Sequence, residues 1–198
     1  MKFLAFVDVH TDLAAVKALA ARAQKEDIDF VLCAGDMSQF GKGLREALEI
    51  FAKCKKEFYM IPGNHETDAL LTDMEKVFPF FKSLHRKAVR IGQYVFLGYG
   101  EGGFGQEDAA FRKLARGWYG QYNGQSLVLV THGPPYGTKI DFLNQRYVGN
   151  VDYQKFIERI KPKVAICGHL HETAGAVDDI GETKVINPGW DGMVVELP

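Results

Sequence analysis

The stretch KVAICGHLHET, residues 163–173, ends an apolar run at Gly168 and then places His169 and His171 two positions apart, beside Glu172. The apolar run is typical of a buried strand. The chain contains only six histidines, so two of them this close together need an explanation. A Gly-His-x-His turn directly after a buried strand indicates a metal site, because imidazole nitrogens are common metal ligands.

Similar apolar runs recur along the chain and alternate with helical patterns. We expect strands at 2–9, 30–36, 57–64, 126–133 and 163–169 and helices at 12–26, 44–54, 106–118 and 151–161. Such alternation predicts βαβ units and a mostly parallel sheet buried on both faces. Residues 88–100 predict a hairpin, and the tail 175–198 predicts a set of antiparallel hairpins. We therefore expect one α/β domain, residues 1–198, with a mixed second sheet.

Composition and charge exclude several classes of protein. At 198 residues the chain is long enough for one well-buried core, and its net charge of −1 offers no bulk attraction to nucleic acid or to an anionic membrane. No apolar run approaches the ~18 residues of a membrane span. Three cysteines show no paired spacing, and two of them, Cys33 and Cys167, are interpreted as buried thiols. We expect a cytoplasmic protein.

Polar residues with metal-ligand chemistry follow five of the predicted strands. They are Asp8-Val9-His10, Gly35-Asp36, Gly63-Asn64-His65, Thr131-His132-Gly133 and Gly168-His169-Leu170-His171. In an open α/β sheet, ligands bind outside the carboxyl ends of the strands. Side chains two positions apart on an extended segment point to the same side, so Asp8 can converge with His10, and His169 with His171.

Each motif alone has an ordinary explanation as a helix cap, a turn residue or a loop histidine. Their recurrence at one end of a single sheet favours a metal centre. The sixth histidine, His85, lies in a Lys/Arg-rich segment and is expected on the surface.

The ligand candidates supply carboxylate, imidazole and amide groups but no sulfur. They are Asp8, His10, Asp36, Asn64, His132, His169 and His171. A single structural zinc takes four ligands and often uses thiolates, so this set favours two ions. Mn²⁺, Fe, Zn²⁺, Co²⁺ and Ni²⁺ all suit it. Two ions roughly 3.5–4 Å apart can clamp both oxygens of an in-line displacement, and Asp36 is the natural bridging ligand.

In their order along the chain, the motifs D-x-H (8–10), G-D (35–36), G-N-H-E (63–66), T-H-G (131–133) and G-H-x-H (168–171) resemble those of the calcineurin-like metallophosphoesterases. The surrounding sequences GDMSQFG, THGPPYGTKID and INPG look most like small prokaryotic phosphoesterases related to cyclic-nucleotide phosphodiesterases. The resemblance implies a four-layer α/β/β/α sandwich with two mixed β-sheets and a dinuclear metal site at the strand ends.

The resemblance also implies a role for each residue. One metal would be held by Asp8, His10, Asp36 and His171, and the other by Asp36, Asn64, His132 and His169. His65 would be the catalytic residue that meets the substrate phosphate and assists the leaving group. Many family members carry an acid three residues after the Asp of G-D that can orient this histidine. Gln39 stands there, which leaves the orienting partner of His65 open.

We therefore expect a phosphoester hydrolase that depends on two divalent metal ions, with Mn²⁺ favoured and Fe, Zn²⁺, Ni²⁺ or Co²⁺ as alternatives. A phosphodiesterase acting on a small or nucleotide-like substrate is favoured over a phosphomonoesterase. A nuclease is disfavoured by the short chain and its net charge of −1. A non-catalytic scaffold is disfavoured because all the ligand positions carry competent residues. The expected partner is a small phosphoester, with neither nucleic acid nor a membrane.

Substrate contacts outside the ligand set are less defined. The Gly-rich residues 99–108 are equally consistent with a mobile flap and with a plain surface turn. Lys139 and Arg146 could approach a substrate phosphate, and Phe104, Tyr136 and Phe142 could stack on a base. Ordinary surface charge and core packing are the favoured interpretations of these residues.

Overall fold

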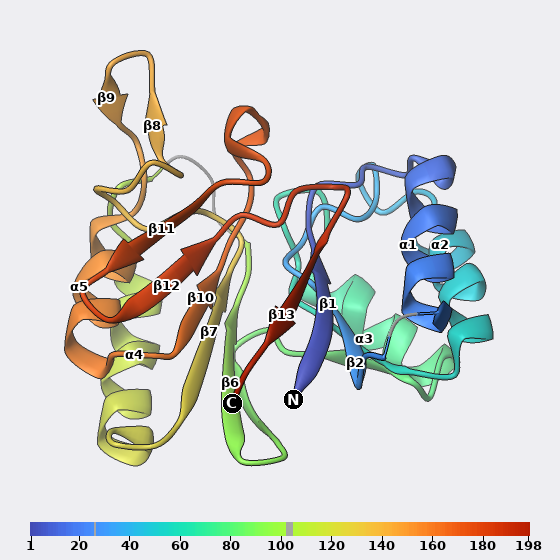
Figure 1. Ribbon diagram of the computed structural model, residues 1–198, viewed down its shortest axis with the longest axis horizontal. Coiled ribbons are helices and arrows are strands. Elements are labelled where there is room, and N and C mark those ends of the chain that lie inside the picture. Colours follow the sequence, from blue (N-terminus) through green and yellow to red (C-terminus); the bar gives the residue numbers. More distant parts are fainter. Residues whose placement is uncertain (26, 102–104) are drawn as a thin grey trace.

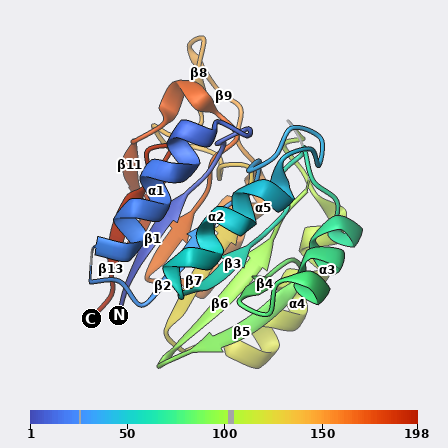
Figure 2. The same ribbon diagram turned by 90° about the vertical axis from the view of Figure 1, so that its right-hand side faces the viewer.

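The protein is a sandwich of two β-sheets with helices on both outer faces (Figure 1). The computed structural model describes residues 1–25, 27–101 and 105–198. α1 (Leu13–Lys25), α2 (Leu44–Phe51) and α3 (Asp68–Val77) cover the first sheet, as seen face-on in Figure 2. α4 (Ala109–Tyr122) and α5 (Val151–Ile160) cover the second sheet. The α/β/β/α architecture implied by the resemblance is confirmed.

Both sheets are mixed, and the pairs between their central strands are parallel. Within the described residues the first sheet has the strand order β13-β1-β2-β3-β4, in which only β13 is antiparallel to its neighbour. Its strands are β1 (Lys2–Phe6), β2 (Phe30–Cys33), β3 (Glu57–Met60), β4 (Phe81–Ser83) and β13 (Met193–Glu196).

The second sheet has the order β11-β12-β10-β7-β6-β5 and is parallel from β12 to β6. Its strands are β5 (Lys87–Ile91), β6 (Tyr94–Tyr99), β7 (Leu127–Thr131), β10 (Val164–Ile166), β11 (Val177–Ile180) and β12 (Thr183–Ile186). A separate hairpin of β8 (Phe142–Leu143) and β9 (Arg146–Tyr147) projects from the sandwich (Figure 1). Short 3₁₀ helices lie at η1 (Ala52–Cys54) and η2 (His171–Thr173).

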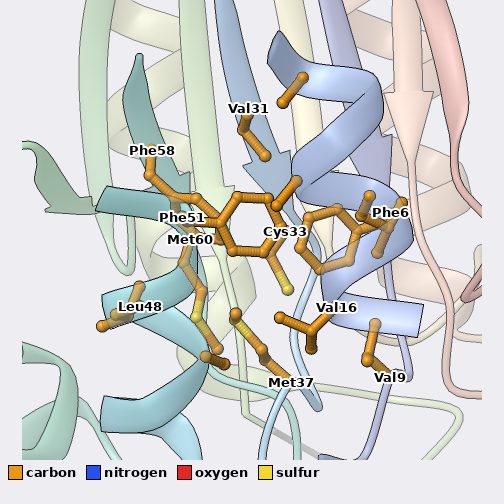
Figure 3. Close-up of a cluster of buried hydrophobic side chains, with 14 of the residues drawn as sticks. Phe6, Val9, Val16, Val31, Cys33, Met37, Leu48, Phe51, Phe58 and Met60 are labelled. Atoms are coloured by element: carbon orange, nitrogen blue, oxygen red, sulfur yellow. The ribbon is translucent and has the colours of Figure 1, made fainter. Parts of the chain in front are cut away.

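Alternation along the strands divides the core into layers. On β1, Leu4 and Phe6 pack with α1 and α2, whereas Phe3 and Ala5 pack between the two sheets. Figure 3 shows the first of these clusters, in which Phe6 stacks on Phe51 of α2 with ring centroids 5.7 Å apart. A third cluster fills the space between the second sheet and α4 and α5. The central strands are thus buried on both faces, and their ends lie at the edge of the sandwich.

Short polar side chains cap the N-termini of α3 and α5. The side chain of Thr67 accepts a hydrogen bond from the backbone N–H of Leu70 at the start of α3, and Asn150 caps α5 in the same way. No helix of the described residues combines the length and apolar character that a membrane crossing needs.

The structure corrects several sequence-based expectations. α3, β4 and the β8–β9 hairpin were not predicted, because short or exposed elements have weak hydrophobic periodicity. Of the antiparallel hairpins predicted in the tail 175–198, β11–β12 is present. β12 also pairs in parallel with β10, however, and β13 crosses to the first sheet. The hairpin predicted at 88–100 is present as β5–β6. That residues 1–198 form a single domain stays a prediction.

Candidate metal centre

Five loops carry the predicted functional side chains, and each follows the carboxyl end of a strand. The loops after β1, β2 and β3 belong to the first sheet, and those after β7 and β10 to the second. Because the sheets pack face to face, these loops meet at one edge of the sandwich. Seven of the eight predicted residues form three overlapping groups: Asp8, His10 and His171; His10, Asp36 and His65; and Asp36, His132 and His169.

The imidazole rings of His10 and His171 approach each other through their Nε2 atoms. Nε2 of His10 lies 3.0 Å from Nε2 of His171, which lies 4.0 Å from Oδ1 of Asp8. The other oxygen of Asp8 accepts a hydrogen bond from the backbone N–H of His169 at 2.9 Å. One carboxylate oxygen and two imidazoles therefore remain within 4.8 Å of one another, a donor set that could hold a divalent cation.

Asp36 is shared by the other two groups. Its Oδ2 lies 3.4 Å from Nε2 of His132 and 3.9 Å from Nε2 of both His10 and His65. Its Oδ1 accepts a hydrogen bond from the backbone N–H of His65 at 2.8 Å. Oδ2 is therefore surrounded by three imidazoles, which is the position expected of a carboxylate between two ions.

Asn64 follows β3 of the first sheet and contacts the two histidines that the second sheet supplies. Its Oδ1 lies 3.1 Å from Nε2 of His132 and 3.0 Å from Nδ1 of His169. The opposite nitrogen of His132 lies 2.9 Å from the carbonyl oxygen of Ala34, which fixes the orientation of this fully buried ring. Amide oxygen, imidazole and carboxylate thus converge from strands of both sheets.

The backbone at the site adopts conformations that non-glycine residues rarely take. φ is 58° at Asp8, 51° at Asp36 and 69° at His169, and each such residue costs about 1–3 kcal/mol. The expectation that Asp8 and His10 lie on one extended segment is wrong, because φ at His10 is also positive, at 46°. A tight turn after β1, rather than strand alternation, brings the two side chains together.

Glycine is required at two positions of the site by close packing. A Cβ at Gly35 would lie 2.7 Å from Nδ1 of His132, and a Cβ at Gly63 would overlap the carboxylate of Asp36. The G-D and G-N-H motifs therefore use glycine to let the loops approach one another.

The donor atoms fit the divalent metals that the resemblance implies. Within the described residues, Oδ1 of Asp8 and Nδ1 of both His10 and His65 are buried without a hydrogen-bond partner. A buried polar atom left unpaired costs about 1–3 kcal/mol, and for Asp8 a bound cation would offset this. Carboxylate, imidazole and amide donors suit first-row divalent ions.

Burial and neighbouring charges set the protonation of the ligand candidates. Burial raises the pKa of Asp8 to about 6 and lowers the pKa of His169 to about 4. Burial also opposes the charge on Asp36, but the hydrogen bond and charge of His132 outweigh it and leave the pKa of Asp36 below its usual value. The same contact raises the pKa of His132 against the effect of burial. The metal-free site therefore retains protons that an ion must displace.

Glu66 is a functional residue for which the sequence analysis proposed no role. Its buried carboxylate accepts hydrogen bonds from the backbone N–H groups of Asp36 at 3.0 Å, Ser38 at 2.7 Å and Gly63 at 3.0 Å. It also accepts one from the hydroxyl of Ser38 at 2.7 Å. Glu66 therefore ties the loop after β2 to the loop after β3. Its place in the G-N-H-E motif was the available signal.

Phe40 contacts the predicted catalytic histidine. Its ring stacks on His65 with centroids 4.2 Å apart and an interplanar angle of 27°, although 72% of Phe40 is exposed. The turn that presents it is closed by two backbone hydrogen bonds between Gln39 and Lys42, both 3.1 Å. With Gln39 in place of an acid, stacking on Phe40 joins the edge-to-face contact with the ring of His10, at 4.7 Å between centroids, in orienting His65.

The expectation that His85 lies on the surface is wrong. His85 is only 3% exposed, and its Nδ1 accepts a hydrogen bond from the backbone N–H of Gly100 at 3.0 Å. Its other nitrogen lies 3.7 Å from Oε2 of Glu101, and its ring stacks on Tyr99. The Lys/Arg-rich sequence around it misled the prediction, because the charged neighbours point outward while the histidine supports the end of β6.

An open pocket of about 450 Å³ lies over the three residue groups. Its lining residues are His10, Asp36, Gln39, Asn64, His65, His169 and His171. Of the additional substrate contacts considered from the sequence, Lys139 lies 3.9 Å from Asp178, and Phe142 belongs to the projecting β8–β9 hairpin. Residues 102–104, which include Phe104 and part of the stretch predicted as a flap or surface turn, lie outside the described residues.

Comparison with known proteins agrees with this fold and site. The sequence profile of the calcineurin-like phosphoesterases matches residues 1–173, and the chain therefore belongs to that family. Members of the family typically bind divalent metals, and membership supports phosphoester hydrolase activity. An uncharacterized protein of Methanocaldococcus jannaschii is 30% identical to this chain over 203 residues, covering 95% of this chain and 88% of that protein.

Solved structures share the fold at low sequence identity. A protein of Thermus thermophilus superposes with a TM-score of 0.79 at 15% identity, covering 96% of this chain and 90% of that one. A structure described as a novel archaeal phosphodiesterase gives a TM-score of 0.58 at 16% identity, covering 96% of this chain and 84% of that chain. At such identities the similarity shows the fold alone.

Proposed function

We propose that this protein is a dinuclear metal-dependent phosphodiesterase acting on a small or nucleotide-like substrate. The observation that carries the proposal is the position of Asp36. Its Oδ2 lies among imidazoles of the two residue groups that contain Asp36, and Asp36 lies on the wall of an open pocket. One ion would be held by Asp8, His10, Asp36 and His171. The other would be held by Asp36, Asn64, His132 and His169.

The proposed chemistry is hydrolysis of a phosphoester bond. When bound, two divalent ions supply a hydroxide nucleophile near neutral pH and neutralise charge on the phosphoryl oxygens. His65 lines the pocket with its Nε2 3.9 Å from Asp36, and it donates a hydrogen bond or a proton to the departing oxygen. Asp36 holds the backbone of His65 in place.

Two considerations favour a diester as substrate. The pocket is open and has a volume of about 450 Å³, so a second organic group on the phosphorus has room beside the centre. One structural neighbour is described as a phosphodiesterase. Mn²⁺ is the favoured ion because the carboxylate and amide oxygens of the ligand set suit it, and the four imidazoles keep Fe, Zn²⁺, Ni²⁺ and Co²⁺ as alternatives. The three cysteines are buried free thiols, in keeping with a cytoplasmic location.

The test removes metal with a chelator and restores Mn²⁺, Ni²⁺, Zn²⁺ or Mg²⁺ separately. Each form is assayed with a chromogenic phosphodiester and with its monoester. We expect metal-dependent turnover that favours the diester, and a loss of at least about 10³-fold in kcat for Asp36→Asn, since this change removes the shared carboxylate charge. Metal content is measured in parallel by atomic absorption.

Asp73→Asn is the matched control, because Asp73 forms an exposed ion pair with Lys76 on α3, away from the site. It should leave turnover unchanged. Full activity in folded Asp36→Asn would refute the proposed centre. A preference for the monoester would indicate a phosphomonoesterase instead of a phosphodiesterase. Failure to take up metal would indicate a non-catalytic scaffold.

A further inference from the structure

A second pocket adjoins the metal pocket, and His171 lies on the wall of both. The second pocket has a volume of about 340 Å³ and lies between η2 and the loop that joins β12 to β13. Trp190, Glu172 and Asp191 are among its lining residues. A ligand whose phosphoryl group lies at the metal centre can therefore extend past His171 into this space.

Trp190 is the largest apolar residue that lines this second pocket. It is 41% exposed and belongs to none of the buried hydrophobic clusters of the described residues. Its ring meets the ring of His171 edge to face, with centroids 6.3 Å apart. A single exposed aromatic residue is ordinary on a protein surface. The informative feature is that this one lies on a pocket wall next to a predicted metal ligand.

Hydrogen bonds hold the Trp190 loop in a fixed position relative to the metal centre. The buried side chain of Asn187 donates to the carbonyl oxygen of Leu170 and accepts from the backbone N–H of Gly189, both at 3.1 Å. The carbonyl oxygen of Gly189 in turn accepts from the backbone N–H of Val7 at 3.1 Å. The indole is therefore presented on a preorganised loop, which lowers the entropic cost of binding a ligand.

The geometry points to this pocket as a subsite for a planar ring of the substrate, with Trp190 as the stacking surface. The inference rests on the proposed function, because the phosphoryl group has to lie at the metal centre for the ring to reach Trp190. Glu172 and Asp191 disfavour a second phosphate and accept hydrogen bonds from amino groups. The class of group that fits is an amino-bearing heteroaromatic ring, of which a nucleobase is an example.

The test compares two ligands that share a phosphate and differ in the ring, namely adenosine 5′-monophosphate and ribose 5-phosphate. Their dissociation constants for the full chain loaded with Mn²⁺ are measured by calorimetry. We expect the nucleotide to bind about tenfold more tightly, as one stacked base allows. Trp190→Ala should remove this ratio, and Trp190→Phe should restore most of it.

Tryptophan emission provides a second readout. The chain has two tryptophans, and Trp118 is only 5% exposed, so quenching by the nucleotide but not by ribose 5-phosphate reports contact at Trp190. Val77→Ala is the matched control, because Val77 is an apolar side chain that is similarly exposed, at 43%, but lies at the end of α3; it should leave the ratio unchanged.

Three outcomes would overturn the inference. If the wild type binds the two ligands with equal affinity, the ring subsite is refuted while the proposed function stands. The same holds if Trp190→Ala keeps the wild-type ratio of the two dissociation constants. Failure of the metal-loaded protein to bind either phosphate overturns it together with the proposed function.

Discussion

At the scale of single residues, the site is built from side chains held in unfavourable conformations. Phe40 combines a left-handed backbone, φ 51°, with a side chain that is 72% exposed. Neither property contributes to stability. Its contact with His65 accounts for both, because a stacked ring restricts the rotation of an imidazole whose Nδ1 has no hydrogen-bond partner within the described residues.

Phe40→Ala is expected to lower kcat about tenfold with little change in KM, because the loss of an aromatic contact worth about 0.5–1.5 kcal/mol leaves His65 free to rotate. Phe40→Tyr should restore most of the rate. Phe40→Gly should lose the rate as well while keeping or gaining thermal stability, since it relieves the left-handed backbone. Steady-state kinetics and thermal melts check this, and an unchanged kcat in Phe40→Ala would exclude the positioning role.

At the scale of elements, two loops of the first sheet act as one unit. Glu66 lies in the loop after β3 and accepts hydrogen bonds from Asp36 and Ser38 in the loop after β2. The position of Asp36 is therefore determined by contacts between loops as well as by its own strand. Hydrogen bonds to a buried carboxylate are among the stronger ones in proteins.

Glu66→Gln is expected to lower the free energy of unfolding by about 3 kcal/mol and to weaken metal binding. The amide NH₂ would face backbone N–H groups that now donate to a carboxylate oxygen, which leaves them unpaired. Denaturant unfolding and metal titration measure the two effects. Glu172→Gln, an exposed change of the same chemistry on η2, serves as the stability control. Equal stability of wild type and Glu66→Gln would contradict the proposed linkage of the loops.

At the scale of the whole molecule, the metal centre lies where the two sheets meet and is partly shielded from solvent. Burial raises the pKa of Asp8 to about 6 and lowers the pKa of His169 to about 4. His169 is then neutral and ready to bind at neutral pH, whereas Asp8 carries a proton below about pH 6. Protons and metal therefore compete for the site over a range set by Asp8 and by His132, whose raised pKa retains a further proton that an ion must displace.

Metal affinity is expected to fall as the pH drops from about 7 to about 5, by at least about tenfold for each unit below the pKa of Asp8, because His132 must lose a proton as well. The sign follows because Asp8 must be ionised to bind, and its raised pKa places that ionisation near pH 6. Calorimetric titration with Mn²⁺ in two buffers of different ionisation enthalpy measures both the affinity and the protons released. An affinity that is constant across this range would contradict the competition.

The prediction of the fold from sequence succeeded where the hydrophobic pattern is strong. The buried strands β1, β2, β7 and β10 and their polar ends were predicted, because apolar runs that end abruptly in polar residues have few alternative interpretations. The predicted surface position of His85 was wrong, and α3 and the β8–β9 hairpin were not predicted. Their placement depends on packing against other elements, which local sequence does not encode.

The sequence by itself determined the family, the layered α/β architecture and the identity of the candidate ligand side chains, because these depend on periodicity and on motifs in order along the chain. The tertiary structure decided how closely these side chains approach one another. His10 and His171 are 161 positions apart, and only the packing of one sheet on the other brings their nitrogens together. It likewise decided that Phe40 covers His65 and that Trp190 borders His171, since each contact joins loops from different strands.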